Sequence, residues 1–172
     1  SAERYQLMSH IDRWVVQATL SAIANGAIRL ADERSCSINL SAQALAEDGF
    51  LDFVVECLDH SQVPPHRICF EVSETAVMER FDQARRFVAV LHGIGCQFGL
   101  DDFGSGLGSF TTLRDLSIDY LKIDGTYTRD LRPETLNHQV VTAVTAVSRI
   151  LGFRVIAEQV ETQADFETLR SI

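Results

Sequence analysis

Two adjacent aspartates, Asp101 and Asp102, stand at the end of a short apolar run that begins at Gln97. Carboxylates at the end of a buried strand repel each other and lose water, so the pair is costly unless a cation compensates it. Divalent cations such as Mg²⁺ prefer oxygen ligands, and one aspartate can bridge two of them while its neighbour binds one. The alternative interpretation is a strand end followed by a turn, because Asp and Gly are common turn residues.

Polar side chains recur in the other runs that the sequence predicts to be strands. These runs cover residues 36–41, 68–74, 120–124 and 154–161, and they carry Asn39, Glu71, Lys122 with Asp124, and Glu158. Parallel strands covered on both faces should be apolar throughout, so the recurrence favours a shared site over unrelated buried hydrogen bonds. In a β/α barrel the carboxyl ends of the strands meet at one mouth, where the active site lies.

These side chains suggest metal chemistry. All except Lys122 offer oxygen ligands, which suit magnesium, manganese or calcium rather than zinc or copper. A lysine among carboxylates can orient a water molecule, accept its proton or neutralise a developing anion. A structural salt bridge is the alternative interpretation of Lys122.

Helical patterns separate the predicted strands. They cover residues 9–24, 50–59, 81–92 and 137–151, and a last helix begins after a capping pattern formed by Thr162 with Asp165. Ser9 with Asp12 predicts a capping box for the first helix, and Trp14 is expected to anchor its apolar stripe in the core. Alternation of strands and helices predicts a β/α array with a parallel sheet.

Composition limits the class of protein. The 172 residues carry a formal net charge of -9 and 46% hydrophobic content, which is enough for one well-buried domain. The acidity argues against binding a nucleic-acid polymer, although bound cations would allow a small anionic ligand. The sequence shows no apolar run of membrane-spanning length and no signal-peptide pattern, and its spaced cysteines suit a reducing compartment.

Five ordered motifs carry a resemblance to a known family. N-L-S-A, F-E-V-S-E-T, D-D-F-G-S-G, Y-L-K-I-D-G and A-E-Q-V-E follow one another along the chain. In order and spacing they resemble the EAL family of cyclic di-GMP phosphodiesterases. The resemblance implies a bacterial cytoplasmic domain with a modified TIM (β/α) barrel, commonly joined to sensor or GGDEF domains. The implied reaction is magnesium- or manganese-dependent hydrolysis of cyclic di-GMP to the linear dinucleotide pGpG.

The resemblance also implies a role for individual residues. The first metal would be held by Asn39, Glu71 and Asp101, and the second by Asp101, Asp102 and Glu158. Lys122 would orient or deprotonate the attacking water, and Glu161 is a further acid of the last motif, whereas Asp124 matches with a less defined role. Glu74 would pin the loop after Asp102, which resembles the loop that links the site to homodimer formation. Calcium is expected to occupy the site and inhibit turnover.

The chain departs from the family pattern in two respects. The loop with Gly104, Gly106 and Gly108 has Leu107 and Gly108 where Tyr or Leu and Ser are usual. In the family, a strand carrying E-A-L and its metal-binding glutamate precedes the part seen here, and a closing strand follows it. Residues 1–172 are therefore expected to form a partial EAL domain with about five strand-helix units, and to be inactive alone.

Two other functions are considered. One is a degenerate EAL module that binds cyclic di-GMP or a protein partner without hydrolysis. The other uses the chemistry of the residues alone: Lys122 abstracts a proton beside a carbonyl while magnesium holds the enolate. Adjacent Asp101 and Asp102 suit a metal pair better than that single-metal reaction.

Overall fold

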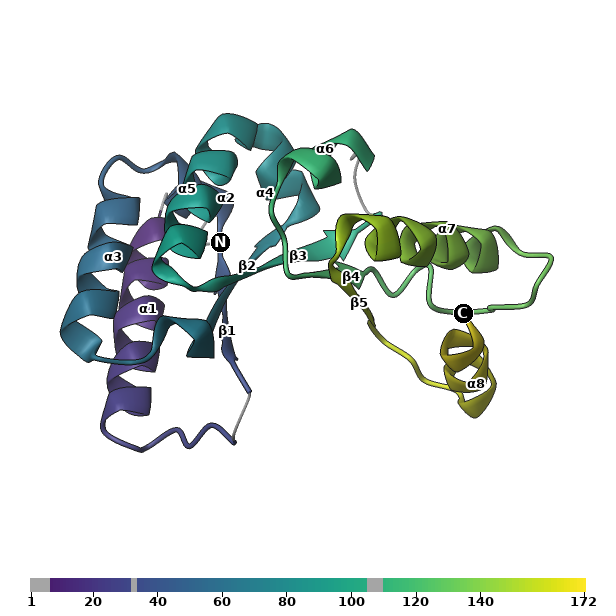
Figure 1. The fold of residues 1–172 in the computed structure, drawn as a ribbon, viewed down its shortest axis with the longest axis horizontal. Coiled ribbons are helices and arrows are strands. Elements are labelled where there is room, and N and C mark those ends of the chain that lie inside the picture. Colours follow the sequence, from purple (N-terminus) through teal and green to yellow (C-terminus); the bar gives the residue numbers. More distant parts are fainter. Residues whose placement is uncertain (1–6, 32–33, 105–109) are drawn as a thin grey trace. The chain divides into compact units, whose positions relative to one another are not determined.

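Parallel strands alternate with helices along the chain, as the sequence predicts (Figure 1). The computed structural model describes residues 7–31, 34–104 and 110–172. The strands are β1 (Cys36–Leu40), β2 (Ile68–Ser73), β3 (Gln97–Phe103), β4 (Tyr120–Ile123) and β5 (Arg154–Ala157), and their order in the sheet is β1-β2-β3-β4-β5. This is the β/α class of fold that the sequence predicts.

The helices fall between the strands. They are α1 (Met8–Ala24), α2 (Ala42–Ala46), α3 (Phe50–Ser61), α4 (Glu74–Glu79), α5 (Phe81–Ile94), α6 (Phe110–Asp115), α7 (Leu136–Leu151) and α8 (Gln163–Ser171). A 3-10 turn, η2 (Pro65–Arg67), leads into β2. Among the described residues, no helix combines the length and the apolar character needed to cross a membrane. Thr162 caps α8 by accepting a hydrogen bond from the N–H of Asp165, which confirms the predicted capping pattern.

The chain divides into two compact units. The first unit contains residues 1–72 and 76–98, and the second contains residues 73–75 and 99–172. In the first unit, β1 and β2 pair in parallel, and α1 lies beside α3 (Figure 1). Phe87 joins its core by packing against the rings of Phe50 and Phe70, at centroid distances of 6.2 and 5.9 Å.

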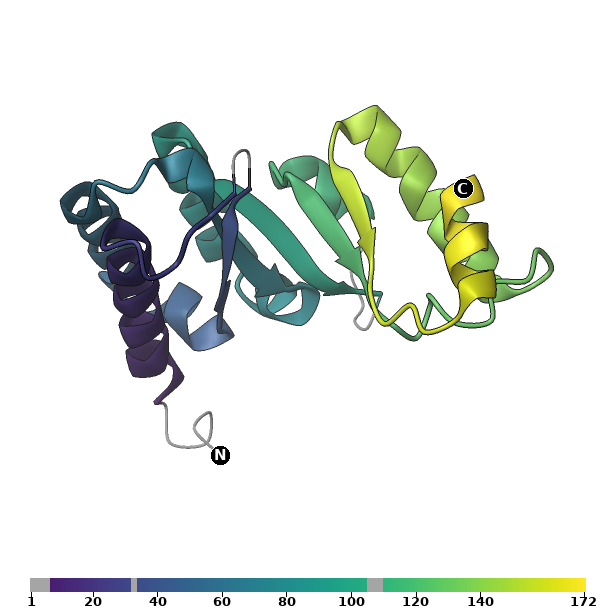
Figure 2. The ribbon, with the colours of Figure 1, turned by 90° about the horizontal axis from the view of Figure 1, so that it is seen from below.

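The second unit places β4 between β3 and β5, with both pairs parallel. Figure 2 shows α7, in yellow-green, alongside β5, and residues of the two elements are in contact. The side chains of Leu121 and Ile123 on β4 are fully buried, and Val141 and Val144 on α7 are almost so. These buried side chains form the apolar core beneath the strand ends that carry the candidate site.

The structure corrects the predictions for α1. The N-cap residue is Leu7, whose side chain makes no capping hydrogen bond, so Ser9 and Asp12 form no capping box. Asp12 instead lies on the buried face with Val16 and Leu20. Trp14 is 69% exposed in this chain and is not a core anchor. The helix buries the face that carries Asp12, Val16 and Leu20, and Trp14 lies on another face.

Strand β5 is shorter than predicted. It ends at Ala157, whereas the sequence pattern predicted a strand up to residue 161. Gln159 adopts a left-handed backbone with a φ of 51°, which is incompatible with continuing an extended strand. Glu158 therefore lies just beyond the end of β5.

Candidate active site

Three carboxylates meet in the second unit, from β3 and from the end of β5. One oxygen atom from each of Asp101, Asp102 and Glu158 lies within 4.8 Å of the other two. We call these three residues the carboxylate cluster. Asp101 and Glu158 are partly buried, and Asp102 is exposed. The oxygen-only donor set fits Mg²⁺, Mn²⁺ or Ca²⁺.

An irregularity in β3 allows two adjacent aspartates to join one cluster. Successive side chains of a regular strand point to opposite faces, so adjacent aspartates would normally separate. The pairing register with β4 shifts between Leu100 and Phe103. Asp102 has a left-handed backbone with a φ of 54°, and its N–H donates to Asp101 Oδ1 at 2.9 Å. Such bulges bend a strand and re-aim its side chains.

Lys122 lies between two members of the carboxylate cluster. Its Nζ atom is 3.0 Å from Asp101 Oδ1 and 2.7 Å from Glu158 Oε1, and the lysine side chain is 20% exposed. Burial raises the pKa of Asp102, and the charges of Asp101 and Glu158 raise it further, while Lys122 lowers it. One ammonium group against three carboxylates leaves an excess of negative charge, which a divalent cation can compensate.

A buried glutamate ties down the start of the loop that follows β3. The N–H of Gly104 donates to Glu74 Oε2 at 2.9 Å, and Glu74 is 2% exposed. Gly104 has a φ of 99°, and a Cβ atom there would lie 2.6 Å from the ring of Tyr127. Glycine is therefore required for two independent reasons. The remaining predicted loop residues, Gly106, Leu107 and Gly108, lie outside the described residues.

Two predicted metal ligands belong to the first unit. Asn39 on β1 and Glu71 on β2 are partners in the parallel register of these strands. Glu71 is buried, whereas Asn39 is exposed. Their proximity to each other follows from the register, and their part in a metal site remains a prediction.

The remaining two acids have partners outside the carboxylate cluster. Asp124 Oδ1 accepts a hydrogen bond from the N–H of Thr126 at 2.8 Å, and the bonds from Thr126 lower the pKa of Asp124. Glu161 forms an ion pair with Arg129 at 3.5 Å, and its side chain is 69% exposed. Asp124 thus stabilises the turn after β4, and Glu161 lies at the surface.

The end of β5 has a group of contacts that no sequence pattern predicted. The hydroxyl of Thr128 donates to the carbonyl oxygen of Glu158 at 2.5 Å, and Arg129 Nη2 donates to Gln159 Oε1 at 2.7 Å. Each contact joins residues 30 positions apart in the chain. No local pattern around either residue signals such a partner.

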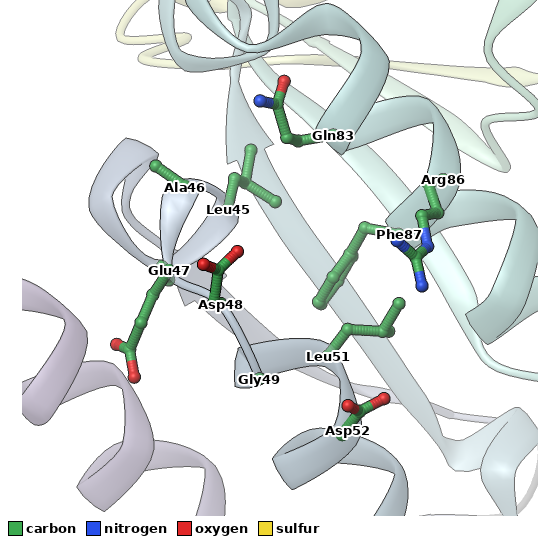
Figure 3. A pocket seen from close by; sticks show the side chains of 11 residues that line it. Leu45, Ala46, Glu47, Asp48, Gly49, Leu51, Asp52, Gln83, Arg86 and Phe87 are labelled. Atoms are coloured by element: carbon green, nitrogen blue, oxygen red, sulfur yellow. The ribbon is translucent and has the colours of Figure 1, made fainter.

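The first unit contains a pocket without predicted site residues. It has a volume of about 160 Å³ and is lined from α2, α3 and α5 (Figure 3). Figure 3 shows the side chain of Glu47 pointing away toward α1, where Arg13 Nε donates to Glu47 Oε1 at 3.0 Å. This pocket has no part in the carboxylate chemistry proposed below.

Comparison with known proteins places the whole chain in one family. The family model described as the EAL domain matches residues 1–172. Cyclic di-GMP phosphodiesterase PdeB of Shewanella oneidensis is 31% identical over 172 residues, which is 100% of this chain and 20% of PdeB. Cyclic di-GMP phosphodiesterase PdeF of Escherichia coli is 32% identical over 171 residues, covering 99% of this chain and 23% of PdeF.

A solved structure agrees with these sequence matches. The PaMucR phosphodiesterase, in complex with c-di-GMP, superposes with a TM-score of 0.89 at 29% identity, covering 99% of this chain and 74% of that one. The chain spans only about a fifth of the length of the curated relatives PdeB and PdeF. On the match of the family model and of these relatives, the chain belongs to the EAL domain family.

Proposed function

We propose that the chain forms the catalytic part of a phosphodiesterase that hydrolyses one ester bond of cyclic di-GMP and releases linear pGpG. The observation that carries the proposal is the carboxylate cluster around Lys122. The names of the relatives PdeB and PdeF and the ligand of the PaMucR phosphodiesterase support the choice of substrate.

Magnesium or manganese ions are the proposed cofactors. Asp101, Asp102 and Glu158 would hold one ion, and Asn39 with Glu71 and Asp101 would contribute to a second. When bound, these ions supply positive charge that stabilises the negative charge developing on the phosphate. The closeness of the three carboxylate oxygens supports this assignment, because without a cation they repel one another.

Lys122 is the proposed residue for handling the attacking water. Its Nζ atom is held by Asp101 and Glu158, which places an ammonium group inside the carboxylate cluster, where it would orient a water molecule. In the reaction, the water oxygen bonds to phosphorus and one ester P–O bond breaks. The water loses a proton and the leaving ribose oxygen gains one, which gives the linear product.

The test is hydrolysis of cyclic di-GMP by the full-length protein with magnesium, manganese or calcium. We expect turnover with the first two ions and little with calcium, because its longer bonds and looser geometry misplace the water. Full activity after exhaustive removal of metal would contradict the metal-dependent reaction. Binding of cyclic di-GMP with no turnover under any metal would favour the alternative, a binding module.

We also propose that full turnover requires more than these 172 residues. This chain covers 74% of the PaMucR phosphodiesterase chain. That chain therefore contains further residues that have no counterpart in the match. A homodimer is proposed as the active form on the family resemblance alone, in which the loop after Asp102, bonded to Glu74 at Gly104, links the site to dimerisation. The mass in solution and the activity of residues 1–172, measured beside the full-length protein, test both points.

A further inference from the structure

We infer that the turn after β4, residues 125–129, positions Glu158 for metal binding, with Thr128 and Arg129 as its positioning residues. The inference rests on the proposed metal site and assigns residues that the family motifs leave without a role. The turn contacts the chain at Glu158, at Gln159 and at Glu161. All of these contacts lie within the second unit.

Thr128 holds the backbone of Glu158. Its side chain has no exposed surface, and its hydroxyl donates to the Glu158 carbonyl oxygen at 2.5 Å. The N–H of Glu158 donates to the carbonyl oxygen of Ile123 on β4 at 3.3 Å. Because both backbone polar groups of Glu158 have partners, its Cα position is determined by β4 and the turn together.

Arg129 holds the residue after Glu158 in an uncommon conformation. Gln159 has a φ of 51°, a left-handed backbone that non-glycine residues adopt rarely and at a cost. Its side-chain Oε1 accepts a hydrogen bond from Arg129 Nη2 at 2.7 Å, and the same arginine pairs with Glu161 at 3.5 Å. These contacts keep the chain bent immediately after Glu158.

Gly125 leaves the space that this conformation needs. A Cβ atom on Gly125 would lie 2.4 Å from Cδ and 2.8 Å from Cβ of Gln159. The close approach involves the base of the glutamine side chain as well as its end, so rotation of the amide alone does not relieve it. The absence of a side chain at Gly125 therefore leaves the room that the side chain of Gln159 occupies.

The contacts of the turn determine where the Glu158 carboxylate lies in the site. Glu158 Oε1 is 2.7 Å from Lys122 and lies in the carboxylate cluster, so a shift of its backbone moves a ligand away from the metal. Groups that orient a metal ligand change metal affinity by about tenfold to a hundredfold when they are removed. Thr128 and Arg129 would have this effect without touching metal or substrate.

The test measures manganese affinity by calorimetry and melting temperature without metal in the full-length protein. Thr128→Val removes the hydroxyl at nearly constant volume and should weaken manganese binding about tenfold or more. Thr128→Ser keeps the hydroxyl and should restore affinity close to that of the parent. The matched control is Thr142→Val, which removes a similar bond to the His138 carbonyl oxygen within α7 and should leave affinity unchanged.

A second pair of variants tests the match between Gly125 and Gln159. Gly125→Ala should weaken manganese binding because its Cβ displaces Gln159. Adding Gln159→Gly relieves the collision and suits the left-handed backbone but also removes the bond to Arg129, so the double variant should recover only part of the affinity. This pair decides the question if Thr128→Val fails to fold.

The outcomes separate this inference from the proposed function. A parent protein that takes up no manganese overturns the metal site and this inference with it. A parent that binds manganese, beside folded Thr128→Val and Gly125→Ala variants that bind equally well, overturns this inference alone. Equal losses of affinity in Thr128→Val and Thr128→Ser, or in Thr128→Val and the Thr142→Val control, would also overturn it.

Discussion

Asp12 in the first unit and Asp102 in the second both have a raised pKa, but their surroundings differ. Burial is the largest cause that raises the pKa of each. At Asp12 the next causes are hydrogen bonds from Ser41, which lower the pKa, whereas at Asp102 they are other carboxylates, which raise it. Asp12 Oδ2 accepts from the N–H and the hydroxyl of Ser41, at 3.1 and 2.5 Å.

The difference separates a structural acid from a candidate metal ligand. The carboxylate of Asp12 has protein donors, and Ser41 in turn caps α2 by accepting from the N–H of Ala44 at 3.2 Å. The carboxylate of Asp102 lies close to Asp101 and Glu158, whose charges raise its pKa, while Lys122 lowers it. Hydrogen bonds to a carboxylate stabilise the fold, and the mutual repulsion of clustered carboxylates is relieved when a cation binds.

The largest expected effect is that of Lys122→Ala. Because the lysine is proposed to act on the attacking water, turnover of cyclic di-GMP should fall by about a thousandfold, within the range of general acid-base groups. Binding of cyclic di-GMP in calcium should change much less. The control is Arg132→Ala, which removes a cation from an exposed pair with Asp130. Turnover within tenfold of the parent would exclude the catalytic role.

Asp102→Asn tests the comparison between the two aspartates directly. Removal of one charge from the cluster should weaken manganese binding by roughly tenfold or more, since affinity follows ligand charge. The same change should slightly raise the melting temperature without metal, because it relieves repulsion from Asp101 and Glu158. Calorimetry and thermal melting measure the two effects.

Asp12→Asn is the control for that experiment. The asparagine keeps an oxygen for both Ser41 donors, so manganese affinity should equal that of the parent. If Asp102→Asn also left affinity unchanged, or lowered the metal-free melting temperature, the distinction between the two sites would be wrong.

Asp12→Ala should cost stability. It leaves the N–H and hydroxyl of Ser41 without their partner in a partly buried place, which costs about 1–3 kcal/mol. Urea unfolding measures the loss, and Asp12→Asn should restore most of it. An alanine variant as stable as the parent would show that Asp12 does not hold α1 to the end of β1.

The pH dependence of stability at Asp12 is a smaller effect. Because burial raises the pKa of Asp12 above the ordinary 3.8, the folded state binds this proton more tightly than the unfolded state. The resulting stabilisation is fully present below 3.8 and is lost as the pH rises through the folded-state pKa. The stability of Asp12→Asn relative to the parent should therefore increase over that window. Urea unfolding at a series of pH values measures it, and a constant difference would contradict the shift.

The smallest expected effect is that of Glu161→Gln. Its exposed pair with Arg129 should contribute less than about 1 kcal/mol to stability. We expect turnover to fall less than tenfold, in contrast to Lys122→Ala. A loss as large as that of Lys122→Ala would place Glu161 in the catalytic machinery that the family motif implies.

Local patterns were sufficient for the existence of the strands and of the longer helices, but not for α2 and α4. Apolar runs predicted all five strands, and the helix from Thr162 begins at the cap that the sequence predicts. They failed where the decisive partner is distant in sequence. Ser9 with Asp12 looked like a local cap, but Asp12 bonds to Ser41, 29 positions away. Trp14 lies on an apolar stripe, yet the packing of α1 buries the face with Val16 and Leu20.

The sequence by itself determined the family, the β/α order and the acidic side chains available for a metal site. Motif identity and apolar periodicity are local properties that can be seen along the chain. The resemblance assigned Asp101, Asp102 and Glu158 to one ion, but only the tertiary structure decided how two adjacent aspartates reach the same cluster, because this depends on the shifted register between β3 and β4. It also decided that Gln159 turns the chain after Glu158, because the side chain of this left-handed residue bonds to Arg129 and fits against Gly125, from a turn about 30 positions away. Pairing register and long-range hydrogen bonds arise only when the strands are assembled.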